Sequence, residues 1–296
     1  MHGLPANVRG IIFMVLSAGL FVINDTFLKL ATEGLPPFQT LFLRGVSAAI
    51  WCLPLVIFTG NLGRLHMAVD RWVLLRNLSE LGAVLAFIVA LKQVALADIT
   101  AINMTAPLLL LIGCAVFFRE TLGWWRGALV ALGFIGALLV AQPSGQGASP
   151  LLLLGFVCAT LSAGRDLIGR RVGGHVPTLV VAYAVILTVM IGGGIAHVLF
   201  EQWQVPSTET ILYLVGSGFF LVGGQFFLFL SYRTGETGVV APFFYTFAVW
   251  AVVSGIVVFG TLPNELALAG IGLILVSGVT IAVVDERRRR RLTPTA

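Results

Sequence analysis

The sequence predicts an all-α integral membrane protein with ten transmembrane helices, arranged as two five-helix repeats of inverted topology. Hydrophobic residues make up 58% of the 296 residues and charged residues only 10%, whereas ordinary soluble domains carry about 25% charged residues. The mean hydropathy is +1.00. Long apolar runs alternate with short polar connections along the chain, and the second half resembles the first at one constant offset.

The apolar runs are close to the roughly 20 residues that a helix needs to cross a bilayer. Helices are expected because lipid cannot satisfy open backbone groups, and because the runs are longer than barrel strands. The runs are residues 8–30, 38–59, 72–91, 99–118, 124–141, 151–168, 178–200, 210–232, 238–260 and 266–284.

An internal duplication is indicated when the second half is moved back by 141 positions without a gap. The shift superposes pairs that are mostly polar, proline or glycine: Asp166 on Asp25, Arg170 on Lys29, Pro177 on Pro36, Gly223 on Gly82, Arg233 on Lys92 and Phe259 on Phe118. The sequence therefore predicts a first repeat at 1–141, a linker at 142–150, a second repeat at 151–286 and a basic cytoplasmic tail at 287–296.

The basic residues predict the orientation in the membrane. With the N-terminus inside, every Lys and Arg except Lys29, Lys92 and Arg44 falls on the inner side, so both termini are expected in the cytoplasm. Five spans per repeat place the start of the second repeat on the opposite side. Inverted repeats are typical of secondary transporters that work by alternating access.

Charged residues near the span ends are candidates for gates. Asp25 and Lys29, like Asp166 and Arg170, lie one helical turn apart and could be local ion pairs. The alternative uses the duplication: Asp25 with Lys92 would close an outer gate, and Asp166 with Arg233 an inner gate.

Polar groups at membrane depth are candidates for the substrate cavity. Glu80 lies in the middle of its span, where an acid is costly unless it is paired or hydrated. It is predicted either to couple transport to protons or to pair with Arg76 or Arg44. The other cavity candidates, which could instead join helices by hydrogen bonds, are Asn24, Asn103, Gln225, Tyr245 and Trp250.

Several chemistries are not expected. The three cysteines share no metal-ligand spacing, and motifs for ATP binding, zinc proteases and nucleophile elbows are absent. We therefore expect no metal, no cofactor and no enzymatic activity. The basic tail is interpreted as a topology and lipid-headgroup signal rather than a nucleic-acid site.

Two stretches resemble the EamA domains of the bacterial drug/metabolite transporter superfamily. They are "FFRETLGWWRGALVALGFIGALLVAQP" at 117–143 and "GVVAPFFYTFAVWAVVSGIVVFGTLP" at 238–263. Thr261 stands where the family commonly has an acidic residue, whereas Glu120 is retained in the first half. The resemblance implies an inner-membrane carrier in which spans one, three, four, six, eight and nine surround a cavity.

The sequence and the resemblance together predict a transporter, expected as a monomer among membrane lipids, that exports amino acids including aromatic ones. Uptake or exchange of S-adenosylmethionine or a nucleoside-like metabolite is the alternative within transport. A membrane enzyme acting on lipid-linked substrates and a passive pore are the alternatives from other classes.

Overall fold

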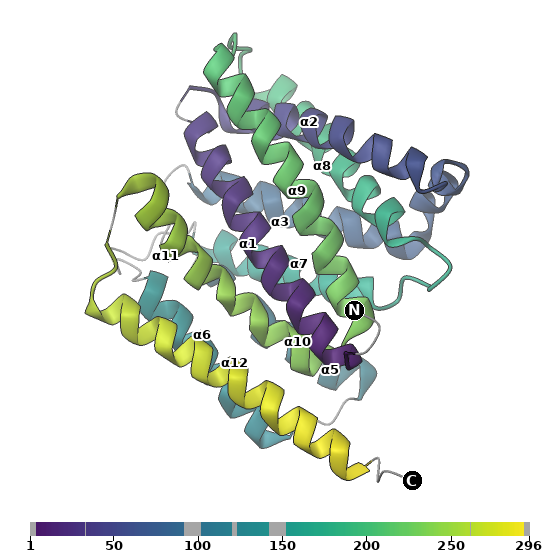
Figure 1. Ribbon diagram of the computed structural model, residues 1–296. Coiled ribbons are helices and arrows are strands. Elements are labelled where there is room, and N and C mark those ends of the chain that lie inside the picture. The colour runs from purple at the N-terminus through teal and green to yellow at the C-terminus, as the bar shows by residue number, and fades with distance from the viewer. Residues whose placement is uncertain are drawn as a thin grey trace.

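A computed structural model describes residues 4–32, 34–91, 102–119, 123–141, 152–260 and 262–292, and all regular structure in these ranges is helical (Figure 1). The α-helices are α1 (Ala6–Thr32), α2 (Pro37–Phe58), α3 (Arg71–Leu91), α5 (Ala106–Phe118), α6 (Trp124–Ala141), α7 (Leu152–Gly169), α8 (Thr178–Phe200), α9 (Thr208–Thr234), α10 (Thr237–Val240), α11 (Thr246–Phe259) and α12 (Glu265–Leu292). Two 3-10 helices, η1 (Leu62–Val69) and η2 (Ala241–Tyr245), join them.

Each apolar run predicted from the sequence overlaps a described helix. Six segments are long and apolar enough to cross a membrane, and they are centred on α1, α2, α3, α8, α9 and the α10–η2–α11 stretch. Shorter apolar helices occur within α5, α6 and α12. The chain is therefore a multi-pass membrane protein, and the ten-span layout stays a prediction.

The sequence predicts one continuous helix for the run at 238–260, but the structure divides this run into three segments. It begins as α10, tightens into η2 and resumes as α11. Pro242 lies in η2, and proline lacks the N–H that an α-helix interior requires. Residues 287–292 of the basic tail continue α12 as a helix.

The helices pack in pairs. Helix α1 packs chiefly on α9, α3 on α7, α2 on α8 and α6 on α12. Figure 1 shows α1 beside α9 through the middle of the bundle, with α6 and α12 along one edge and α2 and α8 along the opposite edge. The end of α9 meets the start of α1, where the Ser231 hydroxyl donates to the Gly10 carbonyl at 2.7 Å. We call this end of the bundle the terminal face.

Helix ends repeat at the offset of 141 residues. Pro36 and Pro177 precede α2 and α8 with nearly the same backbone angles, φ/ψ of −58°/144° and −63°/141°. Arg119 and Gly260 follow α5 and α11 in the left-handed region, at φ of 53° and 64°. Their backbone N–H groups donate to the carbonyls of Cys114 and Gly255, which are also 141 residues apart.

Candidate functional site

A buried acid in the bundle interior is held by two helices. Glu80 on α3 accepts a hydrogen bond from Arg165 Nη1 on α7 at 2.6 Å, and the two side chains are 9% and 11% exposed. Gln225 on α9 donates from Nε2 to the other carboxylate oxygen at 3.2 Å. A buried charge is costly unless it is paired and hydrogen-bonded, so these contacts explain how Glu80 is tolerated at this depth.

Arg165 joins two carboxylates. Besides Glu80, it contacts Asp166 on the same helix through Nε–Oδ1 at 2.7 Å and Nη2–Oδ2 at 3.1 Å. The planar guanidinium suits such two-point contacts. Tyr232 of α9 lines the same pocket as Asp166. Helices α3, α7 and α9 therefore meet at one group of charges.

The charges continue toward the other end of the bundle. Arg44 of α2 is only 7% exposed, and it is attracted to both Glu80 and Asp25. Asp25 of α1 is exposed at the protein surface when no lipid is considered. The order Asp25, Arg44, Glu80, Arg165, Asp166 alternates in sign. With Arg76, which is attracted to Glu80 and Asp166, these residues form a set without net charge, which we call the charge network.

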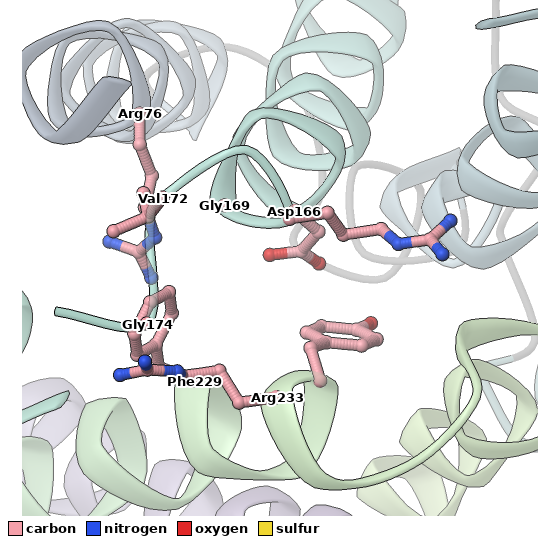
Figure 2. A pocket seen from close by; sticks show the side chains of 9 residues that line it. Arg76, Asp166, Gly169, Val172, Gly174, Phe229 and Arg233 are labelled. Atoms are coloured by element: carbon pink, nitrogen blue, oxygen red, sulfur yellow. The ribbon is translucent and has the colours of Figure 1, made fainter. Parts of the chain in front are cut away.

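A pocket of about 320 Å³ opens beside the charge network near the terminal face (Figure 2). We call it the arginine pocket. Figure 2 shows the guanidinium groups of Arg76 and Arg233 near the ring of Phe229, with the Asp166 carboxylate facing the same opening. The Cζ atoms of Arg76 and Arg233 lie 5.2 and 5.5 Å from the centre of the Phe229 ring. The lining residues are Arg76, Asp166, Gly169, Arg170, Val172, Gly174, Phe229, Tyr232 and Arg233.

The inner-gate candidates Asp166 and Arg233 both line the arginine pocket but do not pair with each other in the described structure. Asp166 is bonded to Arg165, whereas Arg233 Nη1 donates to the Val176 carbonyl at 2.8 Å and to the Thr178 hydroxyl at 3.2 Å. For the outer gate, Asp25 accepts from Asn24 at 2.8 Å. Its proposed partner Lys92 lies outside the described residues.

Four of the cavity candidates lie away from the arginine pocket. Asn24 is buried and accepts from the Ser217 hydroxyl of α9 at 2.8 Å. Asn103 accepts a contact from Cys158 Sγ at 3.6 Å, and Trp250 donates to the Val15 carbonyl at 3.2 Å. Tyr245 in η2 is fully buried, and its hydroxyl has no hydrogen-bond partner in the described part of the chain. The first three contacts join helices.

The partner of Glu80 was not identified from the sequence. Arg76 and Arg44 were considered as direct partners, but the ion pair is with Arg165. Arg76 instead extends toward Phe229 and Asn77. The available signal was the position of Arg165 inside the apolar run at 151–168, next to Asp166.

Comparison with known families identifies the first half of the chain. Residues 8–142 match the EamA-like transporter family. Over this first half, the chain is similar to EamA-like transporters. The EamA-like match agrees with the resemblance seen at 117–143, and it indicates a membrane transporter rather than an enzyme.

Named relatives match nearly the whole length of the chain. A riboflavin transporter of Rhizobium johnstonii is 29% identical over 96% of this chain and 94% of its own. A riboflavin transporter of Vibrio cholerae is 26% identical over 96% of each chain. An S-adenosylmethionine uptake transporter of Rickettsia conorii is 25% identical over 97% of each chain.

A solved crystal structure supports the fold alone. It superposes with a TM-score of 0.80, covering 96% of this chain and 97% of its own, at 21% sequence identity.

Proposed function

We propose that this chain is a ten-helix secondary transporter that moves a flat, nucleoside-like or flavin-like metabolite across the inner membrane by alternating access. The observation that carries the substrate class is that full-length relatives are named for riboflavin and S-adenosylmethionine. Each of these solutes joins a planar heteroaromatic ring to a polar or charged arm. The arginine pocket offers both kinds of contact, the ring of Phe229 and the guanidinium groups of Arg76 and Arg233.

The inverted-repeat part of the proposal is supported by how the helices pair. When the two repeats are exchanged, α1 corresponds to α7 and α9 corresponds to α3. The contact of α1 with α9 therefore corresponds to the contact of α7 with α3, and both are extensive. The exchange also converts α1 with α11 into α7 with α5, and both occur. The pairs α2–α8 and α6–α12 are unchanged by the exchange. Two equivalent halves can rock about a shared central site.

Export of amino acids, including aromatic ones, is the second candidate. The charge network alternates carboxylates and guanidinium groups, which would suit the ammonium and carboxylate groups of a zwitterion. In either case, we propose that both termini lie in the cytoplasm and that the working unit is a monomer. The basic residues support this orientation.

Counterflow in proteoliposomes tests the substrate. Vesicles loaded with unlabelled riboflavin are expected to accumulate labelled riboflavin transiently and saturably, and the same assay is run with adenosine, S-adenosylmethionine and phenylalanine. Protein-free vesicles give the background. Exchange confined to phenylalanine and other amino acids would move the function to the second candidate. Uptake that does not saturate with any solute would indicate a pore.

Glu80 is the proposed site of proton coupling. Its surroundings are Arg165, Arg76, Arg44 and Gln225, so protonation would require the pair with Arg165 to open. We expect Glu80→Gln to exchange substrate without a gradient but to lose acceleration by an imposed pH gradient, because the amide cannot carry the proton. The control is Glu209→Gln, which makes the same change at an exposed acid. Equal acceleration of both variants would exclude Glu80 as the coupling residue.

A further inference from the structure

The arginine pocket adds the positive charge of Arg233 to the neighbouring charge network, which has no net charge. Arg76 and Arg233 line it, with Asp166 as the acid among the lining residues. Asp166 is already engaged by Arg165 at two points, 2.7 and 3.1 Å. Arg76 and Arg233 contact Phe229 through its ring face, which does not compensate a full charge. The pocket is therefore electrostatically prepared for an anion.

Hydrogen-bond donors in this region also lack acceptors. Arg76 is 1% exposed, yet its Nε has no hydrogen-bond partner among the described residues, and neither does Nδ2 of the adjacent Asn77. Arg76 Nη1 donates to Asn77 Oδ1 in a hydrogen bond that is long, at 3.3 Å. Native structures satisfy nearly all buried donors, so an unpaired guanidinium nitrogen beside a pocket indicates a missing acceptor.

Two glycines lie beside these guanidinium groups. A Cβ added at Gly169 would lie 3.6 Å from Arg76 Nε, and one added at Gly174 would lie 3.6 Å from Arg233 Nη2. Both distances are ordinary van der Waals contacts, so a methyl group would fit without forcing a neighbour to move. It would take up part of the pocket space beside the two arginines.

We propose that the arginine pocket is a binding subsite for a phosphate monoester. A dianion matches several guanidinium groups, each of which presents paired N–H donors to phosphate oxygens. Phe229 and Tyr232 beside the arginines suit an aromatic ring on the same ligand. The ligand class is thus the phosphorylated form of a metabolite that contains an aromatic ring. The assignment of the ring rests on the proposed transport function.

Such a ligand would act on the transport cycle from the terminal face, which the basic residues place in the cytoplasm. Arg76 belongs to the first half of the chain, and Arg233 belongs to the second. A phosphate bound to both would hold the two halves together. Phosphorylated product in the cytoplasm would then inhibit transport by occupying the pocket.

Calorimetric titration of the purified full-length protein with inorganic phosphate, in lipid-free detergent, tests the subsite. We expect Arg233→Gln and Gly169→Ala each to weaken binding at least about tenfold, because each removes or covers a charge-assisted contact. Arg233→Lys, which keeps the charge, should retain part of the affinity. The control is Arg64→Gln, which removes an exposed arginine of η1 that does not line the pocket. No binding by the unmodified protein, or equal binding by all variants, would overturn the proposal.

A second titration distinguishes a metabolite phosphate from a lipid headgroup. Together with counterflow, it also tests the phosphate subsite separately from the proposed transport function. Flavin mononucleotide should bind at least about tenfold tighter than inorganic phosphate in the unmodified protein and lose that advantage in Arg233→Gln. Displacement of bound phosphate by phosphatidylglycerol nanodiscs, with no binding of the mononucleotide, would assign the pocket to lipid headgroups and overturn the metabolite assignment. Riboflavin counterflow without phosphate binding would refute the subsite alone, and phosphate binding without counterflow of ring metabolites would refute the proposed substrate alone.

Discussion

Replacement of Arg165 with alanine is expected to abolish transport and to destabilise the protein by about 3–5 kcal/mol. The guanidinium group neutralises two carboxylates, Glu80 at 2.6 Å and Asp166 at 2.7 Å. Its loss would leave two acids together in the bundle interior, where unpaired charge is most costly. The Gln225 amide, which also donates to Glu80, cannot replace the missing charge.

Thermal unfolding in detergent and counterflow in proteoliposomes measure the two effects separately. The control is Arg171→Ala, which removes an exposed arginine shortly after the end of α7, whose described contacts include the faces of Phe118 and Trp72 at 4.9 and 5.8 Å. We expect this control to lose less than about 1 kcal/mol. If Arg165→Ala fails to fold, the triple variant Glu80→Gln, Arg165→Gln, Asp166→Asn should recover folding, because it removes all three charges together. Equal stability of the two arginine variants would contradict the charge network.

The positions of the helices follow from the sequence because the membrane leaves the backbone few alternatives. An apolar run of about 20 residues must close its own hydrogen bonds in lipid, so the runs predicted at 8–30 and 38–59 correspond to α1 and α2. The break within the run at 238–260 was less evident. Pro242 indicates it, but whether a proline bends a helix or interrupts it with a 3-10 segment depends on tertiary packing.

The charge network could not be derived from the duplication, because it is not symmetric. The offset of 141 relates Asp25 to Asp166 but sets Arg44 against Val185 and Glu80 against Leu221. The partners of Glu80 come from α7 and α9, which are far from it in sequence. Local spacing favours a neighbour one turn away, whereas the actual pairing depends on how the helices of the two halves meet.

The effect of replacing glycines in α2 and α9 also could not be predicted from the sequence, because the sequence does not show how closely a neighbouring helix approaches. A Cβ added at Gly45 would lie 2.6 Å from Met190 Cβ and 2.9 Å from Met190 Cα on α8. The Met190 backbone cannot move alone. A Cβ added at Gly223 would instead meet only the end of the Leu20 side chain, at 3.0 Å.

Gly45→Ala is therefore expected to separate α2 from α8, to cost about 1–3 kcal/mol of stability and to slow transport. The transport effect follows because Arg44, the preceding residue, would be displaced from Asp25 and Glu80. Gly223→Ala is the matched control, and we expect it to be neutral or to stabilise α9 by up to about 1 kcal/mol, since alanine favours helix over glycine. Unfolding temperatures and counterflow rates of the two variants provide the comparison. If Gly45→Ala is stable but transports slowly, the position of Arg44 matters more than the helix contact. If the two alanine variants behave alike in both assays, the α2–α8 approach does not constrain the site.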